Sequence, residues 1–222
     1  MEIDFQKWDV QALSRLMHQA GQIALSYYDA PPSEIKCDGS VVTAADKAIE
    51  DLLAETLDSP DEGLFLIGEE TVDSRGESYV QNALRQTAYI VDPIDGTACY
   101  AAHVPTWGIS IGMAQAGQLT EGMVYLPILK ELYYTDMGRV YRAILDCEQP
   151  MPATLTTTEL DKASTTYSPS GLVAVTQDIC KSGQVNLPNV VHTLACAVVP
   201  LLYLLESRYV AYLGHLKLWD LA

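Results

Sequence analysis

The stretch that decides how this chain folds is Tyr89-Ile90-Val91-Asp92-Pro93-Ile94-Asp95-Gly96-Thr97. Its apolar first half is typical of a buried strand, and two carboxylates, Asp92 and Asp95, follow three residues apart. Mg²⁺ prefers hard oxygen ligands and is usually shared between one or two carboxylates and a substrate phosphate. Gly96 allows a close approach of the backbone, and Thr97 stands where a helix could begin with its N–H groups facing an anion. The stretch therefore predicts a strand that ends in a tight turn with a metal and phosphate site.

Two further acidic positions belong to the same pattern. The pair Glu69-Glu70 follows an apolar run at residues 64–67, and Asp220 stands next to Trp219 near the end of the sequence. In phosphate hydrolysis two metal ions can activate a water molecule and stabilise the leaving oxygen. Three acidic positions, two of them at predicted strand ends, therefore indicate a phosphate site that binds more than one metal ion.

Four segments resemble, in order, the signature segments of the inositol monophosphatase family. They are residues 36–46, which end in Val42-Thr43-x-x-Asp46, then Gly68-Glu69-Glu70, then Asp92-Pro93-Ile94-Asp95-Gly96-Thr97, and finally Trp219-Asp220. The third segment is the specific one, since a Gly-Glu-Glu or a Trp-Asp alone is a weak signal. The resemblance covers nearly the whole chain. The superfamily also contains fructose-1,6-bisphosphatases and 3'-phosphoadenosine nucleotidases.

Periodicity predicts a mixed α/β or α+β chain, and the resemblance implies its architecture. Amphipathic helices are expected over residues 11–29 and 44–57, with Thr43 as the N-cap of the second. Further strands are expected over 107–116, 119–126, 131–135, 172–175 and 209–213, and a buried helix over 194–205. The resemblance implies a layered αβαβα sandwich of the inositol monophosphatase and fructose-1,6-bisphosphatase type.

The Thr-, Ser- and Pro-rich stretch 146–170 has little periodicity and is predicted to be an irregular connection. We expect a single phosphatase domain over residues 1–222, with an N-terminal lobe of about 1–145 that carries the large sheet and the metal site. The C-terminal lobe, about 146–222, then lies on the substrate side and supplies the last metal ligand. Residues 36–42 are predicted to form a turn, and residues 71–78 a polar loop or the entry to a helix.

The resemblance implies a set of metal ligands for two or three Mg²⁺ ions. Asp92 bridges two metals, Glu69 and the backbone carbonyl of Ile94 complete the first, and Asp95 and Asp220 hold the second. Each position also has a plainer interpretation. An Asp in an Asp-Gly turn often only accepts backbone N–H bonds. The Glu pair could be solvated loop residues, and Asp220 could cap a helix.

The resemblance also implies how water and phosphate are held. Thr97 and Asp46 form a dyad that orients and deprotonates the attacking water, and Glu70 is a second contact to that water. The phosphate lies against the N–H groups of Gly96, Thr97 and Ala98. The alternative for Asp46 is a solvent-facing charge in the first turn of its helix, where the helix dipole favours it.

The substrate side departs from the family pattern. Members that act on inositol phosphates usually carry Gly-Ser/Thr-Ala-Ala where this chain reads Leu194-Ala195-Cys196-Ala197, and a Glu where it has Leu213. We expect Ala195, Cys196 and Leu213 to line the substrate site, where the loss of a buried acceptor would weaken binding of a sugar. Residues 137–141 also depart from the family's glycine-rich hairpin. The sequence therefore leaves the natural substrate open.

Composition limits the class of protein. Of 222 residues, 29 are acidic and 13 basic, which gives a formal net charge of −16. Such a surface disfavours nucleic acid polymers and anionic membranes as partners, and it repels phosphate unless metal ions invert the local field.

The sequence predicts a cytoplasmic protein. It has five cysteines without a C-x-x-C pair, no secretory signal and no apolar run of membrane-spanning length. His18, His103, His192 and His215 form no metal-spaced pair and are interpreted as satisfied surface or core residues.

We therefore expect a hydrolase, namely a Mg²⁺-dependent phosphomonoesterase of the inositol-1-monophosphatase type that acts on a small inositol, sugar or related phosphate. The resemblance implies a homodimer. A 3'-phosphoadenosine nucleotidase or fructose-1,6-bisphosphatase would keep the metals and change the pocket. A degenerate, non-catalytic member that acts as a binding scaffold is the alternative from another class. The altered substrate segment and a sequence that stops at Ala222 motivate it.

Overall fold

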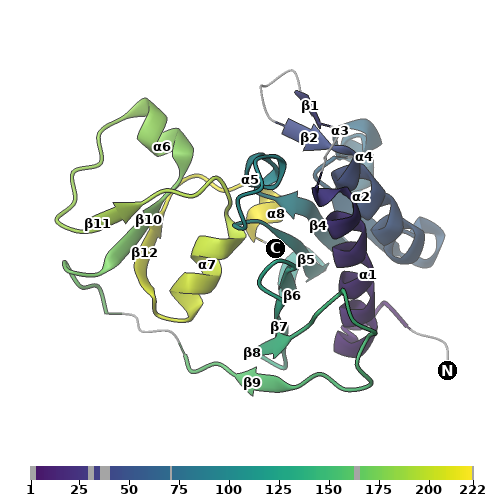
Figure 1. The fold of residues 1–222 in the computed structure, drawn as a ribbon. Coiled ribbons are helices and arrows are strands. Elements are labelled where there is room, and N and C mark those ends of the chain that lie inside the picture. The colour runs from purple at the N-terminus through teal and green to yellow at the C-terminus, as the bar shows by residue number, and fades with distance from the viewer. Residues whose placement is uncertain (1–3, 30–32, 36–40, 71, 163–165, 222) are drawn as a thin grey trace.

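A twisted seven-stranded sheet forms the centre of the molecule in a computed structural model, which describes residues 4–29, 33–35, 41–70, 72–162 and 166–221 (Figure 1). Its strand order is β3-β4-β5-β6-β7-β8-β9. The strands are β3 (Leu64–Gly68), β4 (Thr87–Asp95), β5 (Gly108–Gln115), β6 (Gln118–Leu126), β7 (Glu131–Asp136), β8 (Arg139–Ile144) and β9 (Thr157–Glu159). Only β3 and β4 are parallel among these neighbours, so their carboxyl ends, which carry the acidic residues, meet at one edge.

Two helices cover one face of this sheet. They are α1 (Val10–Tyr28) and α2 (Ala44–Leu57), and both were predicted from their apolar spacing. Asp9 caps α1, and Thr43 caps α2 as predicted. Their apolar sides pack on alternate residues of the strands to form the main core, which includes Leu13, Met17, Ile49, Leu53, Leu66, Tyr89, Val91, Ile109, Ile111 and Tyr125.

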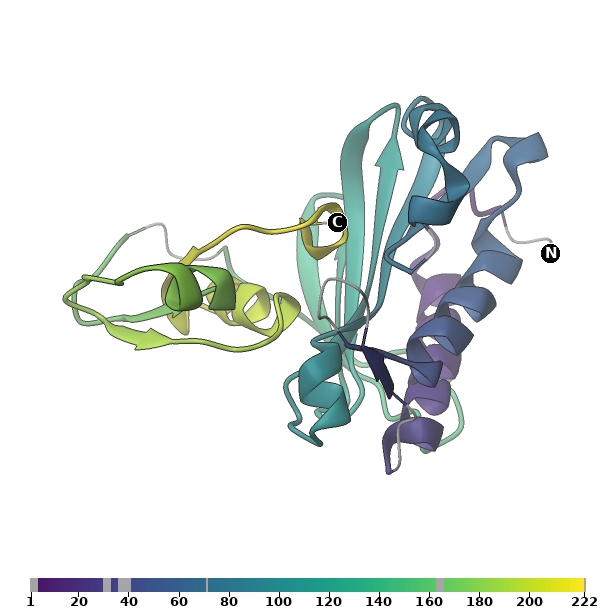
Figure 2. The same ribbon diagram turned by 90° about the horizontal axis from the view of Figure 1, so that it is seen from above.

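Three shorter helices cover the other face. α4 (Glu77–Ala83) packs near the β3 edge, together with Trp219 of α8 (Leu218–Leu221), on Phe65, Ile67, Ala88 and Ile90. α7 (Val198–Leu205) packs on Leu126 and Tyr133 farther along the sheet. Figure 2 shows α1 and α2 on one side of the sheet, with α7 and α8 on the other. Smaller elements are β1 (Ser33–Ile35), β2 (Val41–Thr43), η1 (Pro60–Glu62), α3 (Val72–Arg75) and α5 (Thr97–Ala101).

A second, three-stranded parallel sheet lies beyond α7, with the order β11-β10-β12. Its strands are β10 (Leu172–Val175), β11 (Val190–His192) and β12 (Tyr209–Leu213), and α6 (Gln177–Ser182) follows β10. Helices and sheets thus alternate in layers, as the resemblance implied. The division into lobes at about residue 145 stays a prediction, although β9 at Thr157–Glu159 still belongs to the large sheet.

Several local predictions were wrong. The stretch 146–170 was expected to be irregular, but it contains β9, and β8 and α6 were missed. Met137 and Gly138 both have positive φ and close a tight hairpin between β7 and β8, so this segment keeps a hairpin despite its different sequence. The helix expected over 194–205 begins only at Val198. In the segment 71–78 the predicted helix entry is confirmed, since α4 begins at Glu77, whereas α3 was not predicted. The tip of the predicted turn, 36–40, lies outside the described residues.

The metal-site strand is also longer than predicted. β4 continues through Asp92 to Asp95, and its pairing with β5 is irregular between these two residues. The turn itself is at Gly96, whose φ of 87° favours glycine, and α5 begins at Thr97 as predicted. Within the described residues, no helix is long and apolar enough to cross a membrane.

Candidate active site

The inner face of α2 carries two buried carboxylates. Asp46 and Glu50 are one helical turn apart, so they project from the same side of the helix, and their exposed fractions are 1% and 2%. The rest of this face is apolar, with Ile49 and Leu53 in the core. The alternative interpretation of Asp46 as a solvent-facing charge is therefore wrong.

Hydrogen bonds hold Asp46 in place. One carboxylate oxygen accepts from the backbone N–H of Thr43 at 2.8 Å and from its hydroxyl at 2.5 Å, which completes a capping box. Burial raises the pKa of Asp46 to about 6, while the bonds from Thr43 oppose this shift and the nearby charge of Glu70 adds to it. A carboxylate with such a pKa can exchange a proton near neutral pH.

Thr97 lies next to Asp46, as the predicted dyad requires. Its Oγ1 is 3.4 Å from the second oxygen of Asp46 and 3.0 Å from the backbone oxygen of Ile94. A hydroxyl has one proton, so the shorter bond to Ile94 takes it and the contact to Asp46 is long. Catalytic hydrogen bonds are often long in ligand-free enzymes and tighten when substrate binds.

Glu50 is a site residue that the sequence analysis missed. Its Oε2 accepts a hydrogen bond of 2.9 Å from the backbone N–H of Glu70, so it fixes the second residue after β3. A Cβ at Gly68 would lie only 2.2 Å from the carboxyl carbon of Glu50. The available signal was an acidic residue four positions after Asp46 on an otherwise apolar helix face.

Gly68→Ala is expected to destabilise the protein by about 1–3 kcal/mol, since the new methyl group must displace the buried carboxylate of Glu50. The free energy of unfolding from urea denaturation measures this effect. Gly183→Ala is the matched control, because the nearest atom there would be 3.7 Å from the new Cβ. Equal effects at both glycines would contradict the assigned contact.

Asp92 and Asp95, the paired carboxylates of the third segment, are both buried, but they differ in their surroundings. Asp92 is 2% exposed and lies opposite Ser110 of β5. Asp95 turns toward the start of α7, where its carboxylate accepts bonds from the N–H of Ala197 at 2.8 Å, the N–H of Val198 at 2.6 Å and the thiol of Cys196 at 2.8 Å. Asp95 therefore accepts backbone N–H bonds, as the plainer interpretation allowed, and the donors come from α7 rather than from its own turn.

Glu69 and Asp220 are the remaining predicted ligands with side chains. Glu69 is 18% exposed and lies 3.5 Å from the ammonium of Lys217, which also stands over the ring of Trp219 at 5.2 Å. It is thus an ion-paired residue rather than a freely solvated one. The backbone of Asp220 lies in α8, next to Trp219, and its side chain lies outside the described residues.

The donor chemistry of this edge suits a hard divalent cation. Buried carboxylates lie at the end of β4 and on α2, and half-buried ones follow β3. The pKa of Asp46 is raised by its burial and by the negative charge of Glu70. Among the described side chains, however, no three His, Cys, Asp or Glu groups converge on one point. Asp95 is bonded to α7 and Glu69 to Lys217, so the predicted ligands are close to the site without forming a complete coordination shell.

A pocket of about 280 Å³ opens beside Asp95, lined by Asp95, Thr176, Gln177, Leu194, Ala195, Cys196, Ala197, Tyr212, His215 and Leu216. Ala195 and Cys196 were predicted for the substrate side, and both pack closely against Gly96. Leu213 is 41% exposed and does not line this pocket. Thr176, Tyr212 and His215 were missed, because the crossover that brings β10 and β12 together is not visible in sequence spacing.

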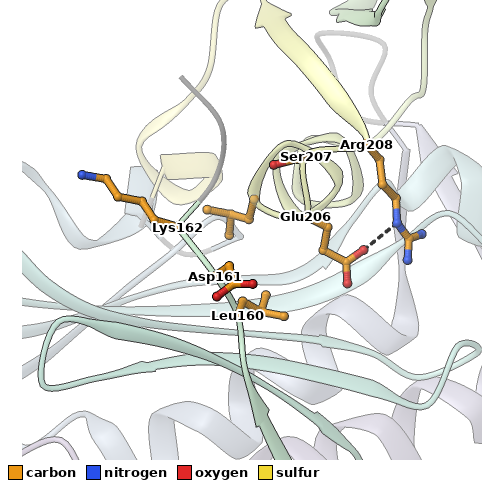
Figure 3. A pocket seen from close by; sticks show the side chains of 7 residues that line it. Leu160, Asp161, Lys162, Glu206, Ser207 and Arg208 are labelled. Carbon is orange, nitrogen blue, oxygen red and sulfur yellow. Dashed lines mark ion pairs between the residues drawn. The ribbon is translucent and has the colours of Figure 1, made fainter. Parts of the chain in front are cut away.

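A larger pocket, about 440 Å³, lies at the opposite end of α7 and is lined by Leu160, Asp161, Lys162, Leu205, Glu206, Ser207 and Arg208 (Figure 3). Arg208 and Glu206 form an ion pair of 2.7 Å there. Asp95 lies at the amino end of α7, so this pocket is separate from the candidate site.

The profile of the inositol monophosphatase family matches residues 5–222. This chain belongs to the inositol monophosphatase family. The match includes all four segments that carried the resemblance, and it agrees with the layered fold.

Members of the family with different names are similar to this chain. A histidinol-phosphatase of Chlorobaculum parvum is 34% identical over 134 residues, which are 59% of this chain and 48% of that protein. A 3'(2'),5'-bisphosphate nucleotidase CysQ of Salmonella typhimurium is 30% identical over 136 residues, 60% of this chain and 54% of that protein. The chain thus spans about half the length of these curated relatives.

Solved structures of the family share the fold. An IMPase/NADP phosphatase complexed with Mg²⁺ and phosphate superposes with a TM-score of 0.71 at 15% identity, over 95% of this chain and 76% of that one. At this identity the likeness concerns the fold alone.

Proposed function

We propose that the chain is a metal-dependent phosphomonoesterase that hydrolyses a small phosphate ester with an activated water. The observation that carries this proposal is the pairing of buried Asp46 with the Thr97 hydroxyl, 3.4 Å away, on a segment that also carries the buried carboxylate of Asp92 five residues earlier. A proton acceptor, an orienting hydroxyl and hard anionic ligands are the groups that metal-assisted hydrolysis needs.

The residues have separate tasks in this proposal. Glu69, Asp92, Asp95, Asp220 and the carbonyl of Ile94 would hold two or three Mg²⁺ ions. The ions supply Lewis-acid activation and neutralise the charge of the phosphate. The Mg²⁺ in the complex of the IMPase/NADP phosphatase, which shares the fold, supports the choice of Mg²⁺ as the ion.

The proton leaves the water through the dyad. When the Thr97 hydroxyl donates to Asp46 instead of Ile94, its oxygen accepts the proton of the water while its own proton passes to Asp46, for which a pKa of about 6 is suited. Glu70, held by Glu50, is the second contact to the water. The backbone N–H groups of Gly96, Thr97 and Ala98 are proposed to bind the phosphate.

The pocket beside Asp95 is proposed to receive the leaving group. Its lining includes Ala195 and Cys196, which lie next to Gly96, and the polar residues Thr176 and His215. His215 is positioned by a 2.6 Å contact from Nδ1 to Asp178. Hydroxyl and imidazole groups of this kind suit a polar leaving group such as a sugar, polyol or amino alcohol.

Phosphate release is the direct test. We expect release from at least one of inositol 1-phosphate, histidinol phosphate and fructose 1,6-bisphosphate in the presence of Mg²⁺, and none after treatment with EDTA. Release that does not depend on metal would contradict the mechanism. A folded chain that releases no phosphate from any of these or from a nucleotide bisphosphate would favour the non-catalytic scaffold.

A nucleotidase is the second candidate function. It is supported by the 30% identity to the bisphosphate nucleotidase CysQ. Release of phosphate from adenosine 3',5'-bisphosphate at a higher kcat/KM than from the three esters above would favour this assignment.

A homodimeric assembly and a cytoplasmic location stay predictions. Size-exclusion chromatography with light scattering measures the oligomeric state.

A further inference from the structure

Lys217 brings a positive charge into the acidic edge of the sheet. It belongs to the segment between β12 and α8, and its ammonium lies 3.5 Å from Oε1 of Glu69. It also stands 5.2 Å from the centroid of the Trp219 ring, which adds a cation–π contact. The lysine thus approaches the acidic edge from a part of the chain that follows Glu69 by almost 150 residues.

The position of Lys217 is held by the docking of α8. Trp219 packs in the apolar cluster with Phe65, Ile67 and Ile90, and its backbone oxygen lies 3.5 Å from the hydroxyl of Ser110. Because the indole is fixed on the sheet, the lysine two residues earlier is kept near the end of β3. The contact with Glu69 therefore follows from the packing of the C-terminal segment.

We infer that Lys217 is a resident counter-cation of Glu69 that competes with metal entry and sets the metal affinity of the site. This inference rests on the proposed role of Glu69 as a metal ligand. A carboxylate that has an ammonium beside it carries less negative potential toward a second cation, and the two cations repel each other. When a metal ion binds to Glu69, the lysine must either move away from this carboxylate or stay and weaken the binding of the ion by repulsion.

The size of the effect can be estimated from Coulomb's law. The repulsion between a singly and a doubly charged cation is strong at short range even in a medium with the dielectric constant of water, and salt screens it because the Lys217 side chain is 58% exposed. Each 1.4 kcal/mol corresponds to a factor of about ten in affinity. Removal of the lysine charge is therefore expected to tighten binding of the first Mg²⁺ about tenfold.

Calorimetric titration of the metal-free full chain with Mg²⁺ tests this inference without any assay of activity. Lys217→Gln is expected to lower the Kd about tenfold, while Lys217→Arg keeps the charge and should stay within about threefold of the parent protein. Lys162→Gln is the matched control, because Lys162 lines the pocket at the other end of α7 (Figure 3). Its Kd for Mg²⁺ should not change.

The outcomes separate this inference from the proposed function. If the parent protein binds Mg²⁺ and Lys217→Gln binds it equally or more weakly, Lys217 is not a competing cation and the inference is overturned. If Lys217→Gln binds Mg²⁺ and the parent protein does not, the lysine blocks the site and the inference is supported. If neither binds Mg²⁺, both the metal site and the inference fail. A variant that unfolds is recognised by circular dichroism, and Lys217→Met then replaces Lys217→Gln.

Discussion

Asp92→Asn is expected to lower metal-dependent phosphate release by roughly 10²–10³-fold or more, the range seen when one preorganised electrostatic group is removed from an active site. Asp92 is 2% exposed at the irregular end of β4, and we propose that it bridges two metal ions. Asparagine keeps the shape of the side chain and loses its charge. The initial rate of phosphate release at saturating Mg²⁺ measures the effect.

The same variant should not unfold the chain. Asp92 is buried, so its charge is costly in the metal-free protein, and a neutral amide of the same shape removes that cost. Asp136→Asn is the control, since Asp136 also ends a strand of the same sheet, β7, and is not a predicted ligand. A fully active Asp92→Asn protein would show that the site has been assigned to the wrong residues.

Elements with a strong local pattern were predictable. The apolar faces of α1 and α2, the cap at Thr43 and the buried strand β3 need only short-range information. β9 and β11 were not predictable in the same way. Each has three residues, all of them exposed, so neither shows an alternation of apolar and polar side chains. Such strands form because a neighbouring strand offers free backbone groups for pairing. Their own sequence gives no sign of that neighbour.

The site residues were likewise predictable where the signal is local and not where it depends on distant contacts. The acidic residues at the ends of β3 and β4 could be found, because parallel neighbours bring their carboxyl ends to one edge. Glu50 was missed because a buried Glu four residues after Asp46 looks like an ordinary surface charge until the face of α2 is known. The contacts of Asp95 with α7 and of Glu69 with Lys217 join residues about 100 and 150 positions apart, and no local pattern predicts such pairs.

Asp95→Ala is expected to destabilise the protein even when no metal is present. Its carboxylate accepts hydrogen bonds from the first N–H groups of α7, at Ala197 and Val198, and the thiol of Cys196 is a third donor. Loss of an acidic helix cap costs about 0.5–2 kcal/mol, and bonds to a charged group contribute about 1.5–3 kcal/mol each. We therefore expect a loss of about 2 kcal/mol, which lowers the Tm by roughly 4–8 °C in a chain of this size.

The measurement is thermal unfolding in EDTA, which separates two roles for the same carboxylate. A residue that served only as a metal ligand would leave the Tm of the metal-free protein unchanged, whereas the cap of α7 is lost with or without metal. Glu77→Gln is the control, because Glu77 is an exposed acid in the first turn of α4. α7 packs between the two sheets. A Tm that falls in Asp95→Ala and not in Glu77→Gln would therefore identify Asp95 as a residue that connects the end of β4 to α7 and, through α7, to the second sheet. Metal binding would then require Asp95 to hold α7 and an ion at the same time, or to exchange one for the other.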